Sequence, residues 1–144
     1  MVFITKLPYG KLNTVSDITK GEASSLEYSR SLSNLAAQLA DEKKAKAIVL
    51  LDLEEVSTMA DYFVLCNGST PIQVRAIAEH IEDKLAEAGY KLYHVEGMSQ
   101  GRWVLLDFGV VIIHVMLDRE REFYGLERLW AGGRMLPYQA AASA

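Results

Sequence analysis

Two apolar runs with almost nothing between them constrain the fold of this chain more than any other feature. Residues 102–107 and 110–117 are separated only by Phe108 and Gly109, so they predict a tight hairpin of two antiparallel strands. A charged, aromatic segment follows at once, and Asp118 is placed to cap a helix there. The rest of the chain must therefore pack around a sheet that contains this hairpin.

Sequence periodicity predicts three helices and three further strands around the hairpin. The helices are expected at about 24–43, 71–88 and 118–130, and the strands at about 46–53, 61–66 and 90–95. Capping boxes at Ser24 to Glu27 and at Thr70 to Gln73 support the first two helix starts. This order of elements is typical of a single-domain α/β fold with a mixed sheet and flanking helices.

The two ends of the chain differ in character from its centre. Residues 1–23 carry proline and glycine without a sustained period and are interpreted as a flexible N-terminal extension. Residues 24–131 form the predicted domain. After Gly132 and Gly133 the sequence is rich in alanine and serine, so residues 132–144 are interpreted as a flexible C-terminal tail.

Charge and cysteine content exclude several classes of protein. The net charge of −4 repels phosphate backbones at long range, so direct nucleic-acid binding is not expected and a basic protein partner is favoured. Cys66 is the only cysteine, which excludes an internal disulfide and a Cys-rich zinc site. No run approaches the roughly 18 apolar residues of a membrane span, and the N-terminus does not resemble a secretory signal. These features predict a cytosolic protein without membrane association.

The turn at Gly68-Ser69 raises the alternative of an enzyme. A nucleotidyltransferase places such a turn, between a strand and a helix N-terminus, beneath the nucleotide phosphates. It also needs a pair of closely spaced acids to hold magnesium. The next strand, at 90–95, has none, and Asp52, Glu96 and Asp107 stand alone at strand ends. A capped turn is the favoured interpretation, and neither a metal nor another cofactor is expected.

The histidines and the cysteine also fail to predict catalysis. His80, His94 and His114 lack the spacing of a metal site. His114 alternates with apolar residues, which favours a core or hydrogen-bonded imidazole over a ligand or a base. Cys66 has no signature of a nucleophile and is interpreted as an inert buried thiol.

Trp103 is the residue of the hairpin whose role periodicity leaves open. Alternation places Trp103, Leu105 and Asp107 on one face of their strand, opposite to the even-numbered residues. If the even-numbered face meets the core helices, the other face presents an indole, a leucine and a carboxylate outward. Exposed aromatic residues ringed by polar groups are typical of binding hot spots. Packing of the indole under the last helix is an equal alternative.

Several motifs follow one another in a fixed order over about residues 26–131. They are Asp61-Tyr62-Phe63-Val64, Gln73-Val74-Arg75-Ala76-Ile77-Ala78, Val95-Glu96-Gly97, Trp103-Val104-Leu105-Leu106-Asp107-Phe108-Gly109, His114-Val115 and Phe123-Tyr124-Gly125-Leu126-Glu127-Arg128-Leu129-Trp130. Together they resemble the ribosomal silencing factor family, also called Iojap. The resemblance implies a nucleotidyltransferase-like fold without transferase chemistry, in bacteria or in an organelle. The N-terminus without a recognisable targeting signal favours the bacterial cytoplasm.

The resemblance also implies a partner and a binding surface. The family binds the large ribosomal subunit through ribosomal protein L-fourteen, blocks joining of the small subunit and so damps translation when nutrients are short. Carried onto this chain, the partner-binding residues are Trp103, Leu105, Asp107, Glu96, Tyr124 and Glu127. The family usually has an acid where this chain has Val110, so this member is expected to rely on Asp107 and neighbouring carboxylates. A homodimer contact through the same face is a further alternative.

Overall fold

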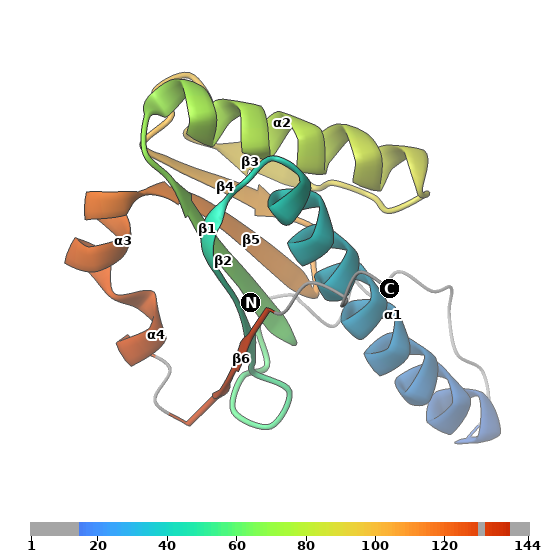
Figure 1. Cartoon of the computed structure of the whole chain (residues 1–144). Coiled ribbons are helices and arrows are strands. Elements are labelled where there is room, and N and C mark those ends of the chain that lie inside the picture. The colour runs from blue at the N-terminus through green and yellow to red at the C-terminus, as the bar shows by residue number, and fades with distance from the viewer. Residues whose placement is uncertain (1–14, 130–131, 139–144) are drawn as a thin grey trace, which may run out of the picture.

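Six strands form one mixed sheet in the computed structural model, which describes residues 15–129 and 132–138 (Figure 1). The strands are β1 (Lys46–Asp52), β2 (Tyr62–Gly68), β3 (His94–Glu96), β4 (Trp103–Asp107), β5 (Val111–Leu117) and β6 (Arg134–Pro137). Their order across the sheet is β3-β4-β5-β2-β1-β6, and β2 and β5 pair in parallel while their other neighbours pair antiparallel. The predicted single-domain α/β fold with a mixed sheet is confirmed.

The helices divide between the two faces of the sheet (Figure 1). Helices α1 (Val15–Glu42) and α2 (Pro71–Glu87) cover one face, where they enclose the main core. The short helices α3 (Asp118–Tyr124) and α4 (Leu126–Leu129) lie on the other face and cover only part of it. Within the described residues, one face of the sheet is therefore packed against two long helices, and the other is only partly covered.

The hairpin forms as predicted. The amide of Phe108 donates to the carbonyl of Val111 at 2.9 Å, and the Asp107 carboxylate accepts the amide of Gly109 at 2.7 Å. Gly109 has a φ of +86°, a left-handed conformation that residues with a Cβ rarely adopt. The turn fixes the register of β4 against β5, so it also fixes which β4 side chains face the open side.

The predicted start of α2 is confirmed, with one difference in its cap. Pro71 is the first helical residue, and the amide of Gln73 donates to the Thr70 hydroxyl at 3.1 Å. In the reciprocal bond the Gln73 side chain accepts the amide of Ser69 at 2.7 Å, one residue before the position that a capping box predicts.

The predicted start of the first helix at Ser24 is wrong, because α1 already begins at Val15. A capping box marks a helix start only where the preceding residues cannot continue the helix. Here Gly21 costs about 1 kcal/mol relative to alanine but does not forbid a helix, and no proline occurs between Val15 and Glu42. The N-terminal extension predicted for residues 1–23 is thus helical from Val15 on, and residues 1–14 lie outside the described part of the chain.

The C-terminal region differs from the prediction in two places. The final helix divides into α3 and α4 at Gly125, which has a φ of +53°, and Asp118 is its first residue rather than its cap. Residues 134–137, predicted to belong to a flexible tail, form β6 and pair with β1. Residues 130–131 and 139–144 lie outside the described residues.

The third strand is shorter than predicted and covers His94–Glu96 only. The residues before it do not continue the ladder with β4 beyond a single bond from the amide of Tyr93 to the carbonyl of Asp107. Tyr90 instead packs edge-on against Tyr28 of α1, with 5.2 Å between the ring centroids. Packing against the helix layer thus replaces strand pairing over residues 90–92.

Candidate functional site

The open face of the sheet brings together four of the predicted partner-binding residues. Trp103, Leu105 and Asp107 are partly exposed on β4, and they alternate with fully buried Val104 and Leu106. Glu96 on β3 lies directly opposite Leu105, so its side chain points to the same face. The predicted alternation along β4 is therefore confirmed, and the even-numbered face packs on the core helices.

Trp103 is held from two sides on this face. Its indole Nε1–H donates to Nδ1 of His114 on β5 at 3.0 Å. On the other side its ring contacts Tyr124 at the end of α3, with 4.8 Å between centroids. The two alternatives for the indole are thus both partly realised, because the ring packs beside α3 and the residue is still partly exposed.

His114 is a buried neutral imidazole, in line with the prediction of a core or hydrogen-bonded histidine. Only 5% of its surface is exposed, and its ring meets Phe63 edge-on at 4.8 Å. Burial, with a contribution from the positive charge of Arg121, lowers the pKa of His114 to about 3. Its Nε2 atom is buried without a hydrogen-bond partner.

We expect the free energy of unfolding to fall as the pH drops from 6.5 toward the folded-state pKa of His114, about 3. In this window the unfolded chain binds a proton that the folded protein excludes. The stability present above pH 6.5 is therefore lost at about 1.4 kcal/mol per pH unit. Urea unfolding of the parent and of a His114→Leu variant across this window measures the effect. A difference in stability between the two proteins that stays constant with pH would contradict it.

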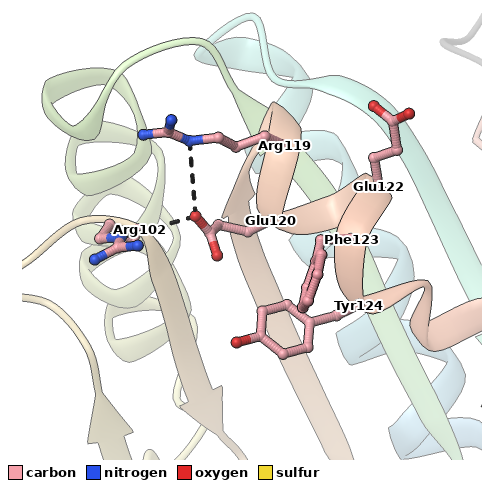
Figure 2. Close-up of a pocket in the computed structure, with 6 residues that line it drawn as sticks. All are labelled: Arg102, Arg119, Glu120, Glu122, Phe123 and Tyr124. Atoms are coloured by element: carbon pink, nitrogen blue, oxygen red, sulfur yellow. Dashed lines mark ion pairs between the residues drawn. The ribbon is translucent and has the colours of Figure 1, made fainter.

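Tyr124 and its neighbour Phe123 extend this surface beyond the sheet. Phe123 is 78% exposed and packs edge-on against Tyr124 at 5.0 Å. Both rings line a hollow of about 740 Å³. Figure 2 shows them near Glu120, which forms ion pairs with Arg102 and Arg119. The spacing of Phe123, Leu126 and Leu129 in the sequence predicts one apolar stripe along the last helix. The turn at Gly125 breaks that stripe, which leaves Leu126 buried and Phe123 exposed.

Glu127 has a different environment from the other predicted contacts. Its carboxylate pairs with Arg121 at 3.2 Å, and its second oxygen is buried without a partner. Arg121 also donates to the carbonyl of Ala47 and to the side chain of Asn67, at 2.9 and 3.0 Å. Glu127 therefore anchors α4 to the sheet through Arg121, and this carboxylate is already engaged inside the protein.

The acids at the edge of the surface are also tied into the structure. Asp107 accepts the amide of Gly109 in the hairpin turn. Glu96 is exposed and lies 3.6 Å from His94, its neighbour two residues away on β3. Val110 is buried, and its carbonyl accepts the amides of Asp61 and Tyr62. The position where the family usually has an acid thus faces the interior in this chain, and negative charge is presented by Glu96 and Asp107.

The turn at Gly68-Ser69 is filled by the chain itself. The side-chain oxygen of Gln73 accepts the amide of Ser69. The ammonium of Lys46 donates to the Ser69 hydroxyl at 2.8 Å and to the Asp118 carboxylate at 2.6 Å. The hydrogen bond from Lys46, supported by one from Asn67, holds the pKa of Asp118 below its usual range, against the opposing effect of burial. Within residues 15–129 and 132–138, no group of three or more His, Cys, Asp or Glu side chains is arranged to hold a metal ion. The geometry agrees with a capped turn.

The thiol of Cys66 is fully buried on β2, and burial raises its pKa to about 12. A thiol with this pKa stays protonated at neutral pH and is a poor nucleophile. Among the helices of the described part of the chain, none is long and apolar enough to cross a membrane.

Comparison with known proteins settles the family. The sequence model described as ribosomal silencing factor during starvation matches residues 26–143. The chain belongs to the ribosomal silencing factor family. It is 44% identical over 101 residues to the ribosomal silencing factor RsfS of Bacillus subtilis (strain 168). The aligned residues cover 70% of this chain and 86% of that protein. The family name describes an action on ribosomes rather than a catalysed reaction.

Two further relatives bear on the fold and on the Iojap resemblance. A crystal structure of a protein from Chromobacterium violaceum superimposes with a TM-score of 0.70 at 34% identity, covering 79% of this chain and 95% of that protein. The chloroplastic protein Iojap of Arabidopsis thaliana is 30% identical over 105 residues, which are 72% of this chain and 44% of the relative. The family therefore has bacterial and organelle members, and the predicted membership is confirmed.

Proposed function

We propose that this protein docks on ribosomal protein L-fourteen of the large ribosomal subunit and thereby keeps the small subunit from joining. The docking surface is the open face around Trp103, Leu105 and Tyr124, and we call it the β4 face. The observation that carries the proposal is the partly exposed indole of Trp103, held between His114 and Tyr124 on a face that the described helices cover only in part. A rigid aromatic centre of this kind is typical of binding hot spots.

The charges around the β4 face favour a basic partner. Glu96 and Asp107 lie on the same side of the sheet as Leu105, and the chain as a whole carries a net charge of −4. Such a rim steers a positively charged protein surface toward the aromatic centre. Ribosomal RNA would be repelled at long range, so the proposed contact is with protein rather than with nucleic acid.

The proposed mechanism is steric and requires no catalytic residue. A standard protein interface buries roughly 1,200 to 2,000 Å², which is enough for stable binding when the central aromatic is well packed. A folded domain of this size on the joining face of the large subunit excludes the small subunit from the same space. Repression of translation follows from occupancy alone, and the proposed place of action is a bacterial cytoplasm.

A subunit-joining assay tests the proposal directly. Purified large and small subunits are mixed under conditions that favour joining, with increasing amounts of the protein, and separated on sucrose gradients. We expect the fraction of joined ribosomes to fall with dose and the protein to migrate with the large subunit. Unchanged joining at saturating protein would reject the silencing mechanism.

The same experiment separates docking from self-association. If the β4 face instead joins two copies of this chain, sedimentation of the free protein gives a dimer and little protein migrates with the large subunit. Partial dimerisation that disappears when large subunits are added would mean that the two contacts compete for one surface.

A further inference from the structure

The hydrogen bond between Trp103 and His114 runs diagonally across two strands. Trp103 lies opposite Met116 in the β4–β5 ladder, and His114 lies opposite Leu105. The indole therefore leans along the sheet to place Nε1 at 3.0 Å from Nδ1 of His114. Exposed aromatic side chains have few such constraints, so this bond selects one orientation of the ring.

The rings form a continuous row around this bond. From β2 to α3 the row contains Phe63, His114, Trp103 and Tyr124, with centroid separations of 4.8, 5.9 and 4.8 Å. Phe63 closes one side of the imidazole, and Tyr124 closes one side of the indole. The imidazole is thus fixed inside the protein and acts on a residue at the surface.

Packing alone does not explain a histidine at this position. Because Nδ1 accepts the indole proton, the proton of the neutral ring must be on Nε2. That Nε2–H is buried and has no partner, which is a cost that an apolar side chain would avoid. The benefit of His114 must come from its acceptor atom.

We infer that His114 is a positioning residue that locks the Trp103 indole in the orientation required for partner binding. The inference rests on the proposed function of the β4 face. An indole that is already ordered loses less conformational freedom when the partner arrives, so the bond favours tight binding. His114 itself is too deeply buried to be a principal contact of the partner.

The experiment compares variants that keep or remove the acceptor. The chain has two tryptophans, so a Trp130→Phe background leaves Trp103 as the only one. His114→Leu removes the acceptor, and His114→Met is a second variant without it in case the first does not fold. His114→Asn is the matched control, because an asparagine side chain is long enough to place its amide oxygen near the position of Nδ1.

The first readout is the indole N–H resonance of Trp103 in the free protein, observed by NMR with hydrogen exchange. We expect exchange to be at least about ten-fold faster in the Leu or Met variant, and protection to return in the Asn variant. The second readout is binding to large subunits, expected to weaken by roughly three- to ten-fold without the acceptor and to recover with Asn.

The outcomes distinguish positioning from a merely structural role. Positioning predicts that the acceptor-free variants keep or gain thermal stability, because the unpartnered Nε2–H is removed, and still bind less well. An unchanged indole resonance, or full binding without the acceptor, would overturn the inference. Failure of the unsubstituted protein to bind large subunits would instead reject the proposed function, while the NMR comparison would still test the Trp103–His114 bond.

Discussion

Replacing Trp103 with alanine should weaken binding to the large ribosomal subunit by about 2 kcal/mol or more, roughly thirty-fold or more in affinity. The substitution removes the aromatic centre of the β4 face and leaves a depression between His114 and Tyr124. It also leaves Nδ1 of His114 without its donor. The fold should survive, because Trp103 is only partly buried and contributes little to the main core.

Cosedimentation of the variant with purified large subunits measures this effect, and urea unfolding verifies that the variant is folded. Ile72 provides the matched control, since it is 74% exposed on α2, on the opposite side of the sheet. Ile72→Ala truncates an exposed apolar side chain of similar kind and should bind like the parent. Equal binding by the two variants would remove Trp103 from the proposed interface.

Much of the β4 face could be predicted from the sequence, because its determinants are local. The two-residue gap at Phe108 and Gly109 forces the hairpin, and the period of two then assigns the faces. Leu105 and Asp107 follow Trp103 to the open side for this reason alone. The proposal that the β4 face docks on a partner rests on the family resemblance, because periodicity alone leaves packing and exposure of the indole as equal alternatives.

The parts that the sequence did not predict depend on distant contacts. The acceptor for Trp103 comes from β5, and no spacing in the sequence links it to His114. Strand β6 forms because its backbone pairs with that of β1 at the edge of the sheet. All four of its residues are exposed, so its sequence shows no alternation of apolar and polar residues that would predict a strand. Exposure of Phe123 depends on the left-handed conformation of Gly125, and the Tyr-Gly-Leu sequence was the available signal.

Replacing Arg121 with alanine should lower the free energy of unfolding by about 3 kcal/mol. The Arg121 side chain is only 11% exposed, and its guanidinium bonds three acceptors on three elements: the carbonyl of Ala47 on β1, the side chain of Asn67 on β2 and the carboxylate of Glu127 on α4. Without it, Glu127 becomes a largely buried acid with neither oxygen paired, and α3 keeps its polar attachment to the sheet only at Asp118 among the contacts of the described residues.

Arg119 is the matched control for this prediction, because it lies on the same helix but its side chain is 82% exposed. Its ion pair with Glu120 is long, at 3.9 Å. Arg119→Ala should change stability by less than about 0.5 kcal/mol. A second comparison isolates the effect of the unpaired Glu127 carboxylate. Adding Glu127→Gln to Arg121→Ala should recover part of the lost free energy of unfolding, because a neutral amide is less costly to leave unpaired. No recovery would mean that packing of the arginine stem, rather than the charge of Glu127, carries the effect.

Replacing Arg121 with alanine should also change the environment of Trp103, although the two side chains are not described in contact. Helix α3 carries Tyr124 onto Trp103, so loosening it should expose Trp103 and shift its fluorescence in a Trp130→Phe background. The positive charge of Arg121 is in addition the second cause of the lowered pKa of His114. Removing Arg121 should raise the pKa of His114 above about 3. The pH range over which stability is lost, from 6.5 down to this pKa, should therefore end at a higher pH. An acid transition that does not move in Arg121→Ala would show that burial alone keeps His114 neutral.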